Sequence, residues 1–122
     1  MLINKKWILI AGLFGFTGVA LGAFGAHIIS DKISENLYET YKTGVLYHLI
    51  HTLIIAVIGF SSYKEFNISG FFFSAGIILF SFSLYIYSIT DNKIFAMITP
   101  IGGISFLIGW GLFIWKTFSK KI

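Results

Sequence analysis

The fold is decided first by WILIAGLFGFTGVALGAFGAHII, the stretch Trp7–Ile29, which contains no Asp, Glu, Lys or Arg. A helix that crosses a bilayer needs about 20 consecutive apolar residues, and this stretch is long enough to provide them. Three further stretches of similar character follow along the chain, at residues 44–60, 70–89 and 96–115. The sequence therefore predicts four transmembrane helices joined by short connections.

The composition of the 122 residues points to the same class of protein. Hydrophobic residues make up 57% of the chain and charged residues 11%, and the mean hydropathy is +0.87. A soluble domain carries roughly 25% charged residues, so this chain has too few charges to cover a surface in water. Cysteine is absent, which excludes disulfides, thiolate metal sites and cysteine nucleophiles. We therefore expect a single membrane domain over residues 1–122.

The connection between the first two spans is the only one long enough to hold structure of its own. Ile33, Leu37 and Tyr41 repeat at i, i+4 and i+8 with polar residues between them, which is typical of an amphipathic helix lying at a membrane surface. We expect Ser30 or Asp31 to cap this helix. The predicted fold class is therefore all-α, a bundle of four transmembrane helices with a short amphipathic interfacial helix between the first and second.

All nine basic residues are lysines, and their distribution predicts the orientation of the chain. With four spans, both termini and the 61–69 connection share one side of the membrane. That side holds six lysines, Lys5, Lys6, Lys64, Lys116, Lys120 and Lys121, and the other holds Lys32, Lys42 and Lys93. An excess of lysine marks the cytoplasmic face, so we expect both termini in the cytoplasm of a plasma (inner) membrane protein. The lysines are topology signals, and we expect no nucleic-acid partner. The three tryptophans, Trp7, Trp110 and Trp115, also fall toward the inner face, where amphipathic rings favour the interface.

Small residues predict how the helices pack. In the first span they form one narrow stripe at helical spacing, comprising Ala11, Gly15, Gly18, Gly22 and Gly25. A second, smaller face comprises Gly12, Ala20, Ala23 and His27. Because small residues let helix backbones approach closely in a bilayer, we expect the first span to touch two neighbours and to lie centrally in the bundle.

Polar residues from the other three spans fall at similar depth in the outer half of the membrane. At about 1.5 Å per residue, His48 lies roughly 8 Å below the outer end of its span. The residues that converge on this layer are His48, His51, Ser81, Tyr85, Thr99, Pro100 and Gly102. Pro100 removes a backbone donor and predicts a kink or an opened turn. We expect a small polar layer open to the outside, above an inner half that is almost entirely apolar.

The two histidines of this layer allow two interpretations. His48 and His51 are separated by one helical turn and share a face, so both imidazoles could bind one metal ion, with His27 as a weaker third candidate. Alternatively, each imidazole hydrogen-bonds to neighbouring groups and holds the helices together, a common use of polar residues in membranes. Two histidines alone make an incomplete metal site, which favours the structural interpretation.

Several short segments together resemble a known family. They are LGAFGAH at 21–27, YHLIH at 47–51, LFSFSLY at 79–85, TPIGG at 99–103 and the pair Gly109-Trp110. In this order they resemble the small bacterial inner-membrane proteins of the YgdD/YwdK type, the domain-of-unknown-function family 423. Phe82 departs from the family's pattern, which usually has a small residue there. The resemblance implies a multi-pass plasma-membrane protein of about this length and supplies no activity, substrate or cofactor.

The sequence contains no catalytic constellation, and no acidic residue lies inside a span. We therefore expect a non-enzymatic accessory or interaction subunit without a cofactor, whose partners are the lipid bilayer and either a second copy or another membrane protein. The first alternative is a small transporter or channel component with an outward-facing polar cavity. The second alternative is a metal or haem binder that uses the His48-x-x-His51 pair.

Overall fold

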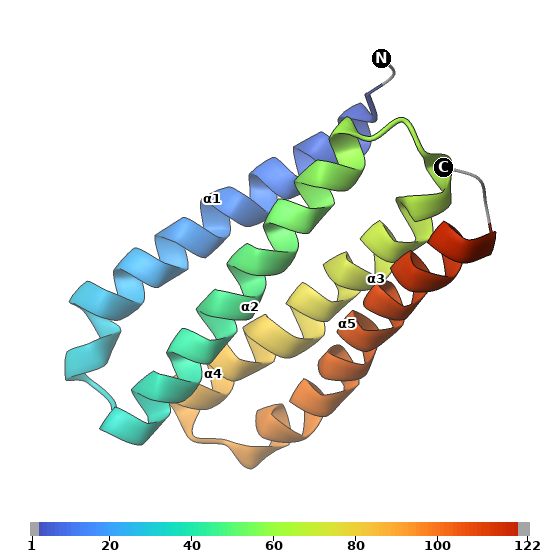
Figure 1. The fold of residues 1–122 in the computed structure, drawn as a ribbon. Coiled ribbons are helices and arrows are strands. Elements are labelled where there is room, and N and C mark those ends of the chain that lie inside the picture. Colours follow the sequence, from blue (N-terminus) through green and yellow to red (C-terminus); the bar gives the residue numbers. More distant parts are fainter. Residues whose placement is uncertain (1–2, 120–122) are drawn as a thin grey trace.

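A computed structural model describes residues 3–119, and every regular element in that range is a helix (Figure 1). The predicted Lys120 and Lys121 of the inner face lie outside the described residues. The long helices are α1 (Lys5–His27), α2 (Glu35–Phe60) and α5 (Lys93–Ser119), and the third span is built from α3 (Asn67–Gly76), the π-helical turn η3 (Ile77–Phe82) and α4 (Ser83–Thr90). Two single 3₁₀ turns, η1 (Ile29–Asp31) and η2 (Lys64–Phe66), lie in the connections. The prediction of four helices long and apolar enough to cross a membrane is confirmed.

The predicted separate interfacial helix is wrong. Ser34 caps α2, because its side chain accepts a hydrogen bond from the Leu37 amide, and the helix then runs unbroken from Glu35 to Phe60. Leu37 and Tyr41 thus belong to the first turns of α2 itself. Tyr41 is almost fully buried against α1, which gives these turns a packing partner that a surface helix would lack. The connection that remains holds only η1, and neither Ser30 nor Asp31 caps α2; the Ser30 hydroxyl donates instead to the Ala26 carbonyl in the last turn of α1.

Gly44 does not interrupt α2, although glycine weakens a helix interior by about 1 kcal/mol. A Cβ at Gly44 would lie 2.9 Å from the Tyr85 ring and 3.2 Å from the Ser81 carbonyl oxygen. The glycine therefore lets the backbones of α2 and the third span approach closely, and this packing compensates for its low helix propensity.

The four spans lie side by side in chain order, each antiparallel to the next (Figure 1). The first span packs along α2 and makes no extensive contact with α5, so the expectation that it lies centrally is wrong. In the most apolar window of each span, 17% of the residues are buried in α1, against 39% in α2 and 44% in the third span. The second small face of α1 is exposed, and a Cβ at Gly12 would meet nothing. Helix α1 therefore packs on α2 through one glycine stripe alone. The central positions of the bundle are occupied by α2 and the third span.

Two clusters of buried hydrophobic residues fill the bundle. We call the end at which α1 begins and α5 ends the termini end (Figure 1). The larger cluster lies toward the termini end and comprises Trp7, Ala11, Ile55, Ile58, Phe73, Ile77 and Phe106. The smaller cluster lies toward the opposite end and comprises Ile29, Tyr41 and Tyr85. The boundary between the two clusters is where the intramembrane histidines lie.

The irregular turn of the molecule lies in the third span. Helix α5 continues through Pro100, whose side chain is exposed, whereas residues 77–82 of the facing span form the π-helical turn. A Cβ on Gly102 would lie 2.6 Å from the carbonyl carbon of Leu79 in that turn. The wide π-helical turn therefore packs directly against Gly102 of α5, where the absence of a side chain leaves room for the turn.

Candidate functional site

His48 is fully buried where α2 meets α1 and α4. Its Nε2 lies 2.8 Å from the Phe14 carbonyl oxygen, and its Nδ1 lies 2.8 Å from the Tyr85 hydroxyl. Because a carbonyl can only accept, Nε2 carries the hydrogen and donates to Phe14, and the Tyr85 hydroxyl donates to Nδ1. A single neutral imidazole thus connects three helices. Gly18 makes the approach possible, since a Cβ there would lie 3.2 Å from the His48 ring and 2.6 Å from Leu49.

Tyr41 and Tyr85 extend this cluster toward the opposite end of the bundle. Their ring centroids are 5.0 Å apart, and the Tyr41 hydroxyl donates a hydrogen bond of 2.6 Å to the Leu21 carbonyl of α1. Gly25 lies against the Tyr41 ring, leaving no room for a side chain. The predicted glycine stripe of α1 therefore accommodates aromatic and imidazole rings of α2, with Gly15 and Gly22 facing Thr52 and Val45.

His51 lies one turn further along α2 and connects it to α5. Its Nδ1 donates to the Tyr47 carbonyl of its own helix over 2.8 Å, and its Nε2 accepts a hydrogen bond of 3.0 Å from the Trp110 indole. The imidazole also stacks on Phe106, with centroids 3.7 Å apart and planes inclined by 12°. Sequence reasoning gave Trp110 only an interfacial role and missed this bond, since no local pattern links residues 59 positions apart.

The structure does not bring the two imidazoles together at one point. Their bonding partners lie on different helices, and all four ring nitrogens are hydrogen-bonded within the protein. His27 is exposed near the end of α1. Within residues 3–119 no group of three His, Asp or Glu side chains is placed to hold a metal ion. A metal at His48 or His51 would have to displace hydrogen bonds that link the helices.

Two other residues of the predicted layer, Thr99 and Gly102, lie where α5 meets the third span, whereas Pro100 is exposed. The Thr99 hydroxyl is 2.6 Å from the Ser83 hydroxyl, which sequence reasoning had left out of the layer. The Ser81 hydroxyl is fully buried and has no hydrogen-bond partner among residues 3–119. The π-helical turn accounts for the placement of Ser83, because the wider turn rotates the residues that follow it relative to an α-helix. No sequence signal marked this turn.

Two more serines connect the third span to α5. Ser69 donates to the Gly109 carbonyl over 2.9 Å, and Ser105 donates to the Phe72 carbonyl over 2.7 Å. Both hydroxyls are buried. These two hydroxyls thus bond to the backbone of the neighbouring helix.

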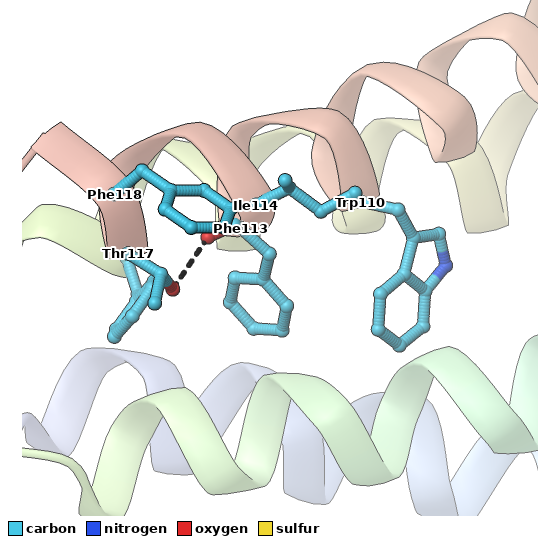
Figure 2. Close-up of a pocket in the computed structure, with 6 residues that line it drawn as sticks. Trp110, Phe113, Ile114, Thr117 and Phe118 are labelled. Atoms are coloured by element: carbon cyan, nitrogen blue, oxygen red, sulfur yellow. Dashed lines mark hydrogen bonds between the residues drawn. The ribbon is translucent and has the colours of Figure 1, made fainter.

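Two shallow cavities lie along α5 and share Trp110. One, of about 470 Å³, is lined by Phe66, Trp110, Phe113, Ile114, Thr117 and Phe118. The other, of about 420 Å³, is lined by Tyr47, His51, Phe80, Pro100, Gly103, Ile104, Phe106, Leu107 and Trp110. Figure 2 shows Trp110 and Phe113 projecting from α5, and the Thr117 hydroxyl bonded to the Phe113 carbonyl over 2.8 Å. We call these two cavities together the α5 groove, and its lining is almost entirely apolar.

Comparison with known proteins gives one consistent result. The model of the family described as "Protein of unknown function (DUF423)" matches residues 21–103. The chain is 40% identical to the UPF0382 membrane protein YwdK of Bacillus subtilis (strain 168), over 87% of this chain and 90% of that protein. It is 42% identical to the UPF0382 membrane protein SAB0533 of Staphylococcus aureus, over 93% and 96% of the two chains. It is 37% identical to the UPF0382 inner membrane protein YgdD of Escherichia coli (strain K12), over 89% and 86%. No solved structure matches the chain.

Proposed function

The chain belongs to the DUF423 family of membrane proteins, and from that premise we propose that it is a non-enzymatic accessory subunit of the bacterial plasma membrane. One observation carries the proposal. Within residues 3–119 the buried histidines of the spans, His48 and His51, have every ring nitrogen in a hydrogen bond, and three of these four bonds join different helices. Groups that are committed in this way stabilise a scaffold, and a substrate would have to displace their hydrogen bonds in order to bind them.

The α5 groove is the surface through which such a subunit would contact its partner. Two of the polar groups in its lining already have partners, because His51 bonds to Trp110 and the Thr117 hydroxyl bonds to the Phe113 carbonyl, so the groove has little to offer a polar solute. Pro100 and Gly103 carry little side-chain bulk, and a Cβ on Gly103 would come no closer than 3.8 Å to Phe80. Small residues such as these let the backbone of another helix approach closely. We therefore expect an apolar transmembrane helix of another membrane protein in this groove.

The test is affinity purification in a gentle detergent with mass spectrometry of the bound proteins. Gly103→Leu fills the groove, and we expect it to lose a partner that the unchanged protein retains. Gly111→Leu is the matched control, because a Cβ at Gly111 meets nothing and this residue does not line the groove. Equal recovery of the partner with both variants contradicts the assignment of the groove. Recovery of a second copy of the chain alone would indicate a homo-oligomer.

The alternative function, a small transporter or channel component, receives less support. Between the histidines and the termini end, the larger hydrophobic cluster fills the space between the helices. Its members include Ile55, Phe73 and Phe106. A polar solute crossing this region would lose its hydration without compensating hydrogen bonds. Solute flux into liposomes that contain only the purified protein would favour the transporter over the accessory subunit.

The metal or haem alternative has an equally direct test. Because the histidine nitrogens are already bonded, we expect the purified protein to show neither a visible absorption band nor stoichiometric metal. Either signal, lost in His48→Leu and kept in His27→Leu, would contradict the accessory role. The comparison of the two variants separates a site within the bundle from binding at the exposed His27.

We further propose that both termini are cytoplasmic, on the basis of the lysine excess on that side. The chain has no cysteine, so single cysteines at Ser62, Asn92 and Ser119 report topology without background. Only Asn92→Cys is expected to react with an impermeant thiol reagent in intact cells. Labelling at position 119 or 62 would reverse the orientation.

A further inference from the structure

A cavity at the termini end is lined mainly by polar and basic side chains that take no part in the hydrogen bonds around His48 and His51. It measures about 550 Å³ and lies between the start of α1 and the connection from α2 to the third span. Its lining residues are Ile3, Asn4, Lys5, Lys6, Ser61, Ser62, Tyr63, Lys64 and Asn67. Three of these are lysines and none is acidic. We call this cavity the lysine cradle.

The walls of the lysine cradle are held in place by backbone and cap hydrogen bonds. The Asn4 amide donates to the Gly59 carbonyl over 2.8 Å, which ties the start of α1 to the end of α2. The Asn4 side chain caps α1 by accepting from the Lys6 amide. On the far wall, the Trp7 indole donates to Asn67 Oδ1 over 3.1 Å. The cradle is therefore a defined feature of the fold and not a gap between loose loops.

The lysines of the cradle have no carboxylate partner. Within residues 3–119 the only ion pair joins Lys42 to Glu39, at the opposite end of the bundle. Glu65 follows Lys64 directly, yet it neither lines the cavity nor pairs with any of the three lysines. Like charges gathered around one cavity repel each other, and an anion in the cavity would relieve that repulsion.

Neutral hydrogen-bond donors surround the same cavity. Ser61 Oγ accepts from the Tyr63 amide over 3.0 Å, so its own hydrogen remains available. The Asn67 amide oxygen is taken by Trp7, and its nitrogen forms no hydrogen bond within the described range. The first turn of α1 adds the positive end of a helix dipole. Lysine, serine and asparagine side chains that line one cavity provide the ammonium, hydroxyl and amide donors that suit the oxygens of a phosphate group.

We propose that the lysine cradle binds a phosphate-bearing anion, with the headgroup of an anionic phospholipid as its expected source. The position favours a lipid, because Lys5 and Lys64 begin two membrane spans and so lie at the level of the headgroups. A free phosphate compound from the aqueous phase shares the same chemistry. This inference is independent of the partner assigned to the α5 groove.

The experiment titrates short-chain phosphatidylglycerol into the full-length protein in a neutral detergent, with phosphatidylcholine as the uncharged comparison. The cradle variant is Lys5→Gln/Lys6→Gln/Lys64→Gln, and its matched control is Lys32→Gln/Lys42→Gln/Lys93→Gln at the opposite end. Each lysine near an anionic headgroup contributes about fivefold in affinity. We therefore expect ~100-fold weaker phosphatidylglycerol binding for the cradle variant and little change for the control.

Inorganic phosphate alone, titrated in a second series, distinguishes the two sources. If phosphate binds the unchanged protein and not the cradle variant, the ligand is a soluble phosphate compound. If only phosphatidylglycerol binds, the ligand is a lipid headgroup. Equal binding of phosphatidylglycerol by both triple variants, equal binding of phosphatidylcholine, or no binding of any probe would each overturn the proposal. All six substituted lysines are exposed, so we expect each variant to fold, and circular dichroism is the check.

Discussion

His48 and His51 lie on neighbouring turns of α2, yet His48 donates from Nε2 and His51 donates from Nδ1. His48 is enclosed by α1, α2 and α4, and its ring packs against Gly18 of α1. His51 faces α5, and its ring forms part of the wall of the α5 groove. The same residue type on one helix therefore serves a closed junction of three helices and an open junction of two.

This difference shows that the neighbouring groups decide which ring nitrogen of an intramembrane histidine carries the hydrogen. A carbonyl beside Nε2 forces the hydrogen onto that nitrogen, and an indole donor beside Nε2 forces it onto Nδ1. Each imidazole is then fully used within the protein. Four predictions test how different the two junctions are.

The largest effect is expected at the glycine that admits His48. Gly18→Leu would force the added side chain into Leu49 and the His48 ring, and we expect a loss of about 3 kcal/mol or more in unfolding free energy. Gly12→Leu, on the same helix with open space around it, should be nearly neutral. Thermal unfolding in mild detergent measures both. Equal stability of the two variants would show that α1 does not pack on α2 through this glycine.

The next effect is removal of the closed junction itself. His48→Leu leaves the Tyr85 hydroxyl without its partner and removes the bond from Nε2 to the Phe14 carbonyl, and we expect about 1–2 kcal/mol of destabilisation from two lost interhelical bonds. His48→Asn should lose roughly half as much, because an amide can still hydrogen-bond to one of them. If His48→Leu unfolds at the temperature of the unchanged protein, the junction adds nothing to stability.

A smaller effect is expected at the open junction. His51→Leu removes one interhelical bond, worth about 0.6 kcal/mol, and frees the Trp110 indole. Trp110→Phe should match this loss, because it removes the other partner of the same bond. Unfolding temperatures of the two single variants and the double variant measure the coupling. Strictly additive losses would show that the bond between His51 and Trp110 is not formed.

The last prediction changes nothing in the protein and compares the two rings directly. Nitrogen-15 nuclear magnetic resonance of histidine-labelled protein in lipid should show one buried ring protonated at Nε2 and another protonated at Nδ1. His48→Asn should remove the first set of signals and His51→Asn the second. Two rings with the same tautomer would contradict the distinction between the junctions.

The candidate site was partly visible in the sequence. His48 and Tyr85 were placed in one layer by counting residues along their spans, and the structure joins them with a hydrogen bond of 2.8 Å. Trp110 and Ser83 were not placed there. Their roles depend on which helix faces them and, for Ser83, on the π-helical turn that rotates the residues after it. Helical periodicity alone gives the wrong face wherever the helix is not an α-helix.

The sequence by itself determined that the chain is an all-helical membrane protein with four spans, because uncharged apolar stretches of this length are a local property of the chain. Tertiary structure alone decided which helices are central. The small residues of α1 form two faces, and nothing in the sequence states that only the face containing Gly18 is used. It also decided that Glu35 begins a single long helix, because the burial of Tyr41 against α1 supports its first turns. Contacts between distant residues make these choices, and a pattern read along one segment does not contain them.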